Sequence, residues 1–393
     1  MSEERLVPKL RFSGFTDEWN EVTLNDVATF SKGKGISKND ISNYGIECVR
    51  YGELYTKYNE MIYNIESKTD LDKNELKLSE KNDILIPCSG ETAIDLATAS
   101  CIQKDQVAIG GDITVIKTNQ YAPFITYYLN QKKTEIAKYA QGVSIVHLYP
   151  KDFKVMNIRI PSINEQKMII RLLEEITKKE QLLESKYQQY QEFKKYLMQQ
   201  IFTQKLRFDD NCQYKTKQVK DFLIESKIEG IDDINKRLTV KLNLNGITVR
   251  ESKTIEIEGA TKQFIRKTGQ FIYGKQNLHK GAFGIIPKEL DGYLTSSDIP
   301  SFDFKEGIEP KWFYYYFARK SFYEKLENLS TGTGSKRISP KEFLNIKIIV
   351  PEFKEQHKIV CLLEKFDEKI NGISNQIVQM NMFKKSLLQQ MFV

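Results

Sequence analysis

Two stretches of the chain, residues 150–202 and 340–392, have the same pattern of apolar and polar positions. Each begins with a short alternating run, around Ile158 and Ile348, that ends at a proline (Pro161 and Pro351). Such a run is typical of a short strand. About 38 residues follow in which apolar side chains recur at steps of three and four, the pattern of a long helix with one apolar stripe. Each stretch is therefore predicted to be a strand followed by a long helix.

The start and the stripe of each helix can be read from particular residues. Ser162 and Glu165 have the spacing of a capping box, in which a hydroxyl and a carboxylate satisfy free backbone N–H groups at a helix start. The residues expected to form the buried part of the stripe are Leu172, Leu183, Tyr190 and Leu197 in the first helix and Leu362, Ile373, Met380 and Leu387 in the second.

The two stretches are copies of one another. At a fixed offset of 190 they align without a gap and share 20 identities in 53 positions, including Pro161/Pro351, Glu165/Glu355 and Gln166/Gln356. The motif Lys-Leu-Arg-Phe at residues 9–12 recurs at residues 205–208. The chain therefore divides into two head-to-tail units, each a variable stretch followed by a copied helical stretch.

So narrow a stripe on so long a helix requires one partner helix, and the chain supplies it. We expect the two helices, each about 57 Å long, to pack as an antiparallel coiled coil with pseudo-two-fold symmetry. A simple dimerisation arm is the alternative. Because each helix follows its own globular stretch within one chain, we favour a spacer that holds two domains apart.

The variable stretches are predicted to be α+β domains. In the first, strands are expected at residues 46–51, 83–87 and 112–117 and a helix at 123–139; in the second, strands at 236–244, 247–257, 271–273 and 283–287 and a helix at 311–329. The predicted segments are a first globular domain (1–149), its strand and helix (150–204), a second globular domain (205–339) and its strand and helix (340–393).

Charge is distributed unequally between the two domains. The whole chain carries +7, but residues 1–149 hold 17 basic and 21 acidic side chains (net −4), and residues 205–340 hold 24 and 18 (net +6). If both domains bind an anion, the first must use a local patch. The sequence predicts no membrane span and no secretory signal. Five scattered cysteines predict reduced thiols in a cytosolic protein.

Loops suited to nucleic acid occur in both domains. In the first, Lys32 and Lys34 lie on a Gly-rich loop whose backbone could approach phosphates, although such loops are also common surface features. A second candidate is the loop with Gln141, Ser144 and His147.

The second domain offers two further loops. Residues 274–281 carry Lys275, Asn277, His279 and Lys280, which can contact base edges, with a polar hairpin turn as the alternative. Residues 330–337 carry Thr333, Ser335, Lys336 and Arg337; small hydroxyls suit phosphate and Arg337 suits a bidentate contact with guanine. The aromatic run 312–317 is interpreted as core rather than as a platform for stacking bases.

Several kinds of catalytic chemistry have no signature in the sequence. A phosphate-binding loop of the G-x-x-x-x-G-K-[ST] type is missing, as is the Asn/Asp-Pro-Pro-Tyr/Phe tetrapeptide of amino-methyltransferases. Three isolated histidines and no paired cysteines predict no metal site. We therefore expect no catalytic residue and no cofactor in this chain.

The layout resembles the specificity subunit of type I restriction-modification systems. The resemblance rests on Pro8 to Phe15 with Glu18 and Trp19, on the duplicated strand-Pro-x-x-x-Glu-Gln-x-x-Ile turn, and on the Lys-Lys-x-Leu-x-Gln-Gln-x-Phe helix ends. It covers the whole chain. It implies two target-recognition domains, each followed by a long helix, with the helices packed antiparallel.

The resemblance also implies a function. Such a chain reads a bipartite target in double-stranded DNA, one half per domain. It recruits two modification subunits that methylate adenine with S-adenosylmethionine, and two restriction subunits that use ATP and Mg²⁺. Two other hypotheses remain: a self-contained DNA-modifying or DNA-cleaving enzyme, and a coiled-coil scaffold without a DNA role.

Overall fold

The chain forms two compact units. The computed structural model describes residues 6–142, 146–251, 259, 261–330 and 337–393. One unit contains Met1–Leu183 with Gln376–Val393, and the other contains Glu184–Asn375. The boundaries between them cut both long helices, whereas the boundaries predicted from the repeat fall at the ends of the helices. None of the described helices is long and apolar enough to cross a membrane.

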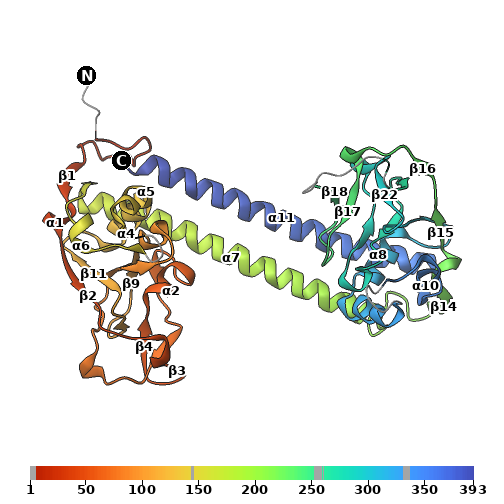
Figure 1. The fold of residues 1–393 in the computed structure, drawn as a ribbon, viewed down its shortest axis with the longest axis horizontal. Helices are drawn as coiled ribbons and strands as arrows, with labels where there is room; N and C mark the ends of the chain where they lie inside the picture. Colours follow the sequence, from red (N-terminus) through yellow and green to blue (C-terminus); the bar gives the residue numbers. More distant parts are fainter. Residues whose placement is uncertain (1–5, 143–145, 252–258, 260, 331–336) are drawn as a thin grey trace. The chain divides into compact units, whose positions relative to one another are not determined.

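Unit 1 is built on a five-stranded sheet in the order β2-β11-β7-β9-β5 (Figure 1). A four-stranded sheet (β10-β4-β6-β3) and the pairs β1-β13 and β12-β8 complete it. Its strands are β1 (Asn20–Thr23), β2 (Ala28–Lys32), β3 (Ile41–Ser42), β4 (Ile46–Val49), β5 (Met61–Ile62), β6 (Ser67–Thr69), β7 (Ile84–Pro87), β8 (Ser89–Gly90), β9 (Ser100–Ile102), β10 (Ala108–Ile109), β11 (Ile113–Thr118), β12 (Val146–His147) and β13 (Asn157–Ile160). Its short helices are α1 (Leu24–Val27), α2 (Tyr51–Thr56), α3 (Ala93–Leu96), α4 (Ala122–Gln131), α5 (Lys133–Ile136) and α6 (Pro150–Phe153).

Unit 2 has a four-stranded sheet in the order β15-β23-β20-β21, a three-stranded sheet β16-β19-β22, and the pairs β14-β24 and β17-β18. Its strands are β14 (Tyr214–Gln218), β15 (Leu223–Ser226), β16 (Glu229–Gly230), β17 (Leu238–Val240), β18 (Ile247–Val249), β19 (Gln263–Ile265), β20 (Phe271–Tyr273), β21 (Phe283–Ile285), β22 (Leu294–Ser296), β23 (Ser301–Phe304) and β24 (Lys347–Pro351). Its short helices are α8 (Pro310–Phe317), α9 (Lys320–Tyr323) and α10 (Pro340–Leu344). Part of the strand predicted at 247–257 lies outside the described residues.

The aromatic run 312–317 belongs to the core of unit 2, as predicted. Trp312, Phe313 and Phe317 are buried on α8. Phe271 of β20 contacts Phe313 edge to face, with the ring centroids 5.1 Å apart. Because these rings are covered by protein, they cannot stack on bases.

The two long helices are α7 (Ile163–Phe202) and α11 (Phe353–Met391). The first turns of α7 enter the core of unit 1, where Ile169, Ile170 and Leu173 are buried with Trp19 of the globular part. The predicted narrow stripe is therefore wider at this end, because the helix packs against its own domain as well as against a helix. Of the predicted stripe residues, Ile373 and Leu387 are buried, and Leu172, Leu183, Tyr190, Leu197, Leu362 and Met380 are partly buried.

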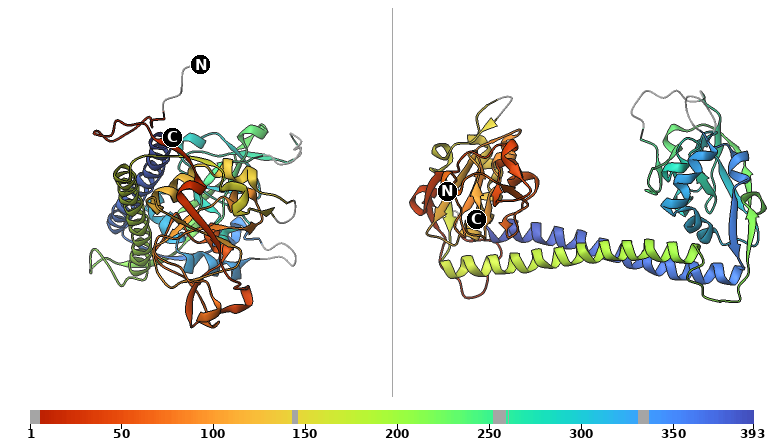
Figure 2. Two further views of the ribbon diagram at one scale, coloured as in Figure 1. Left: turned by 90° about the vertical axis from the view of Figure 1, so that its left-hand side faces the viewer. Right: turned by 90° about the horizontal axis from the view of Figure 1, so that it is seen from below.

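Within each unit the helices run antiparallel, side by side (Figure 2). In unit 1 Lys384 of α11 donates to Glu180 of α7 at 3.2 Å. In unit 2 the matching lysine, Lys194 of α7, binds Asp367 of α11, and Tyr190 contacts Phe366 with the centroids 6.3 Å apart. The duplicated lysine therefore makes one ion pair between the helices in each unit.

The duplicated Glu-Gln pair positions each globular part on its helix. Gln166 accepts from the backbone N–H of Tyr121 at 3.0 Å, and Gln356 accepts from that of Glu309 at 2.8 Å. The predicted capping box forms only in part. The hydroxyl of Ser162 accepts from the backbone N–H of Glu165 (3.4 Å), but the Glu165 carboxylate instead accepts two bonds from Arg11, both 2.8 Å.

Candidate nucleic-acid interface

In unit 1, three chain segments meet at one edge of the main sheet. Strands β2 and β7 both run antiparallel to β11, so the residues that end β2 and β7 lie beside those that begin β11. Lys32 ends β2 opposite Thr114, and the backbone N–H of Cys88, which follows β7, donates to the carbonyl of Asp112 at 2.7 Å. Polar residues on the loops beyond these strands are thereby brought together.

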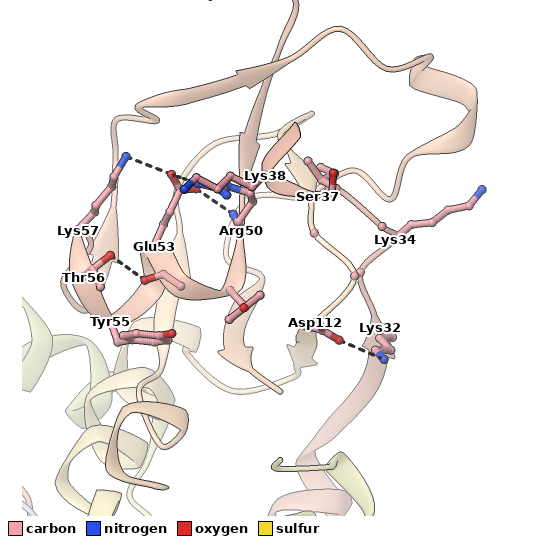
Figure 3. A pocket seen from close by; sticks show the side chains of 17 residues that line it. Lys32, Lys34, Ser37, Lys38, Arg50, Glu53, Tyr55, Thr56, Lys57 and Asp112 are labelled. Atoms are coloured by element: carbon pink, nitrogen blue, oxygen red, sulfur yellow. Dashed lines mark hydrogen bonds and ion pairs between the residues drawn. The ribbon is translucent and has the colours of Figure 1, made fainter. Parts of the chain in front are cut away.

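An open cleft of about 910 Å³ lies at this edge. Five cationic side chains and two carboxylates are among its lining residues: Lys32, Lys34, Lys38, Arg50, Lys57, Glu53 and Asp112 (Figure 3). Unit 1 therefore concentrates positive charge locally although residues 1–149 are net acidic. Such a cleft can attract a polyanion.

The carboxylates of the cleft hold part of this charge in place. Glu53 is buried and accepts from the hydroxyl of Ser67 (2.5 Å), the backbone N–H of Arg50 (2.9 Å) and the ammonium of Lys57 (3.1 Å). Burial alone would raise the pKa of Glu53, but these three bonds outweigh it and the pKa is lowered. Glu53 is therefore an anionic anchor for Arg50 and Lys57.

Lys32 and Lys34 differ in how they are held. Lys32 lies 3.7 Å from Asp112, both side chains being about half exposed. Lys34 extends away from the carboxylates in Figure 3 and has no ion pair within the described residues. Lys34 is thus available to a bound anion.

The glycine between these lysines serves the fold. A Cβ atom on Gly33 would lie 2.0 Å from the carbonyl oxygen of Gly110, so only glycine allows the two backbones to approach this closely. Gly33 is in contact with Gly110, whereas nothing lies within 4 Å of a Cβ atom placed on Gly35. That the glycines let this backbone approach phosphate stays a prediction. The lysine side chains are the main indication of an anion-binding site here.

Gln141 and His147 lie at the neighbouring corner of the same edge. Their backbones exchange hydrogen bonds of 2.9 and 2.8 Å, and β12 pairs with β8. Nδ1 of His147 lies 3.1 Å from the hydroxyl oxygen of Ser89, and its ring stacks on Tyr149 with the centroids 5.9 Å apart. His147 is therefore oriented by two neighbours. Ser144, the third candidate of this loop, lies outside the described residues.

In unit 2 the corresponding place is the loop before β23, where Asp298 contacts two of the predicted site residues. The backbone N–H of Lys275 donates to the carbonyl of Asp298 at 2.9 Å, and Nη1 of Arg337 lies 3.1 Å from its carboxylate. Lys275 and Arg337, which the sequence placed on separate loops, are thus brought together. Thr333, Ser335 and Lys336 lie outside the described residues.

Lys275 also lines an open cavity of about 400 Å³ together with Lys227 and Lys341. The wall of this cavity includes Arg266, which is 1% exposed. Arg266 donates to the hydroxyls of Thr295 and Ser301 and to the carbonyls of Ser226 and Ile299, over 2.6–3.2 Å. Burial lowers the pKa of Arg266 to about 10. Four cationic side chains therefore line this cavity together with one carboxylate, that of Glu225.

The other candidates of the 274–281 loop are arranged differently. The loop joins β20 to β21 as a hairpin, and residues 278–280 form a 3₁₀ turn. Asn277 accepts with its carbonyl from the backbone N–H groups of Lys280 and Ala282. Neither Asn277, His279 nor Lys280 lines the cavity beside Lys275. The loop is thus a hairpin connection, and of its four candidates only Lys275 lies at the Asp298 corner.

The two corners are built on the same backbone frame. Leu148 donates to the carbonyl of Cys88 at 3.0 Å, as Ile338 does to that of Lys275 at 2.9 Å. Cys88 and Lys275 each donate to an aspartate, Asp112 or Asp298. Cys88 therefore corresponds to Lys275, and His147, which precedes Leu148, corresponds to Arg337. The variable stretches, which do not align by sequence, align by hydrogen-bond register.

Several site residues were not found from the sequence: Lys38, Arg50, Lys57 and Asp112 in unit 1, and Lys227, Arg266, Asp298 and Lys341 in unit 2. Most are brought to the site by strand pairing between distant segments. Lys341 did carry a signal, because it is identical to Lys151 within the copied stretch. In the part of the chain that the structure describes, no group of His, Cys, Asp or Glu could hold a metal ion.

Similarity to known proteins extends over both units. A family model described as the type I restriction modification DNA specificity domain matches residues 16–192 and again residues 213–379. The type I restriction enzyme MjaVIII specificity subunit of Methanocaldococcus jannaschii is 21% identical over 401 residues, covering 95% of this chain and 91% of that protein.

Solved structures share the fold. The type I restriction-modification S subunit from M. genitalium matches with a TM-score of 0.62 at 15% identity, over 98% of this chain and 99% of that one. The HsdS subunit from Thermoanaerobacter tengcongensis matches with a TM-score of 0.51 at 13% identity, over 95% and 96%. A chain from a structure of the type I R-M system, described in terms of complex assembly and conformational transition, has a TM-score of 0.56 at 13% identity, over 95% and 97%.

Proposed function

The chain belongs to the type I restriction modification DNA specificity family, and on this premise we propose that it is the DNA-recognition subunit of a type I restriction-modification complex. Each unit reads one half of a bipartite target. The contribution of this chain is recognition, and the transfer of methyl groups and the cleavage of DNA belong to other subunits.

The observation that carries this proposal is the backbone hydrogen-bond arrangement that occurs in both units, around Cys88 and Leu148 in one and around Lys275 and Ile338 in the other. Two units with one backbone frame place different side chains, His147 and Arg337, at the same point of the frame. Each point lies beside a lysine-lined cleft or cavity. A protein that recognises two different half-sites needs the same backbone arrangement in both units but different side chains. The reason is that the duplex backbone is the same in both halves and the bases differ.

Partners and cofactors follow from the same proposal. We expect two modification subunits, which bind S-adenosylmethionine, and two restriction subunits, which use ATP and Mg²⁺. Methylation requires the adenine to leave the base stack, so this chain holds the duplex while a partner performs the chemistry. Such a complex acts on DNA in the cytoplasm.

Duplex binding by the chain assembled with its modification subunit tests the proposal. The affinity is expected to fall linearly with salt concentration on a double-logarithmic plot, because lysine contacts displace counterions from phosphates. One bipartite sequence should bind at least about 10³-fold more tightly than unrelated duplexes. Methyl transfer or cleavage by the chain alone would favour the self-contained enzyme. Binding that is absent, or independent of salt, would favour the scaffold without a DNA role.

A further inference from the structure

The common frame allows the two recognition units to be compared position by position. Ala28 opposes Thr118 at the start of the β2-β11 pair, and Leu223 opposes Phe304 at the start of the β15-β23 pair. Four residues along the first strand of each pair are Lys32 and Lys227. This correspondence comes from strand register and does not depend on similarity of sequence.

A second lysine is identical in both units. Lys151 and Lys341 follow the proline that begins α6 and α10, within the copied stretch. In unit 2, Lys227 and Lys341 line the same cavity. By this correspondence Lys151 is the counterpart of Lys341, as Lys32 is the counterpart of Lys227. Lys32 lines the cleft of unit 1, and Lys151 is not among the residues that line it.

These four lysines are exposed, and Lys151 lies over the ring of Tyr149, with its ammonium 5.7 Å from the centroid. Lys32 and Lys227 have side chains that are 61% and 68% exposed, and each lies near one carboxylate, Asp112 at 3.7 Å or Glu225 at 2.9 Å. Exposed ion pairs of this kind contribute little to stability. Their ammonium groups can therefore exchange a carboxylate for a phosphate at small cost.

The side chains at the two corresponding positions, His147 and Arg337, differ between the units. His147 contacts Ser89 and Tyr149, and Arg337 makes an ion pair with Asp298 in which both side chains are about half exposed. An imidazole offers one ring nitrogen beyond the contact with Ser89, whereas a guanidinium offers several donors in a planar fork that matches O6 and N7 of guanine. The two positions therefore present different hydrogen-bonding patterns.

From these contrasts we propose that different residues of the proposed interface contact the phosphates and the bases. Lys32, Lys151, Lys227 and Lys341 contact phosphates and set the position of each unit on the duplex. His147 and Arg337 contact base edges and determine which sequence each unit accepts. The inference rests on the proposed function, because it assigns roles to residues at that same interface.

The test measures binding of the assembled chain and modification subunit to duplexes that vary in one half-site at a time, over a range of salt concentrations. Each Lys→Ala variant should weaken binding to all duplexes alike and reduce the salt slope by about 1. His147→Ala and Arg337→Ala should each lower discrimination in one half-site only, by roughly 5-fold to 100-fold.

Lys81→Ala and Lys267→Ala are matched controls. Both lysines are exposed, and they precede β7 and β20 at the edge of the sheet opposite to the proposed interface. They should leave the affinity and the salt slope unchanged.

Two results would overturn the inference while leaving the proposed function intact. One is a change of base preference in the lysine variants, and the other is lysine variants that behave as the controls do. If the wild-type complex binds no duplex with sequence preference, the proposed function itself is wrong and this inference falls with it.

Discussion

Replacing Lys384 by methionine is expected to destabilise unit 1 by about 3–5 kcal/mol, because it leaves a buried carboxylate without its cation. Glu180 is 7% exposed and accepts from Lys384 at 3.2 Å. Among the described residues its second carboxylate oxygen has no hydrogen-bond partner. The ammonium of Lys384 is therefore the main compensation for burying this charge between the helices.

Denaturation by urea measures the effect, and two further variants identify its cause. Lys385→Met changes the neighbouring exposed lysine and should shift stability by no more than about 0.5 kcal/mol. Adding Glu180→Leu to Lys384→Met removes the unpaired charge and should recover most of the loss. Equal stability of Lys384→Met and wild type would show that the pair does not hold the helices together.

Arg266→Met is expected to destabilise unit 2 by about 3–5 kcal/mol. The guanidinium supplies hydrogen bonds to two carbonyls and two hydroxyls that are all removed at once. Methionine fills the space but leaves the carbonyls of Ser226 and Ile299 without these donors. Lysine is not expected to rescue the variant, because one ammonium cannot reach four acceptors in a plane.

Hydrogen exchange locates this effect. Protection should fall in β20 and β23 of unit 2, and remain unchanged in β7 and β11 of unit 1. Lys267→Met, at the adjacent exposed position, is the control and should behave as wild type. Loss of protection in both units, or in neither, would contradict a role for Arg266 confined to the core of unit 2.

Much of the fold could be predicted because the helices carry their own signal. Duplicated stripes over more than ten turns predicted α7 and α11 to within a few residues, and the strand at 271–273 was predicted with its observed bounds. The helix predicted at 311–329 breaks at Arg319, whose backbone is extended. Its guanidinium lies over the rings of Phe202 and Tyr316, so tertiary contacts override helical periodicity there.

The helix predicted at 123–139 divides in a similar way. It breaks near Lys132, and α4, α5 and a short 3₁₀ turn take its place. A helical pattern indicates that a segment is helical, but the ends of each helix depend on packing that the pattern does not contain.

The candidate site was less predictable than the fold. Lys32 and Arg337 could be proposed because Gly-rich cationic loops are visible in the sequence. Asp112 and Asp298, which lie beside Lys32 and Arg337, could not, because an isolated aspartate is uninformative until strand pairing places it. The correspondence of Cys88 with Lys275, and of His147 with Arg337, followed from the hydrogen-bond register of the structure.

Net charge was a weak guide for a physical reason. The acidic total of residues 1–149 is an average over the whole surface, whereas a duplex responds to the potential at the face that it touches. The cleft with Lys34, Lys38 and Arg50 provides that local potential. A domain can therefore be acidic overall and still present a cationic face.

Each unit is proposed to read one half of a bipartite target. Sequencing of methylated adenines in cells that express this chain with its modification subunit tests it most directly, with wild type compared to Arg337→Ala. We predict two half-sites separated by a fixed gap, with Arg337→Ala relaxing one half and leaving the other half and the gap unchanged. A contiguous motif, or equal relaxation of both halves, would contradict the account.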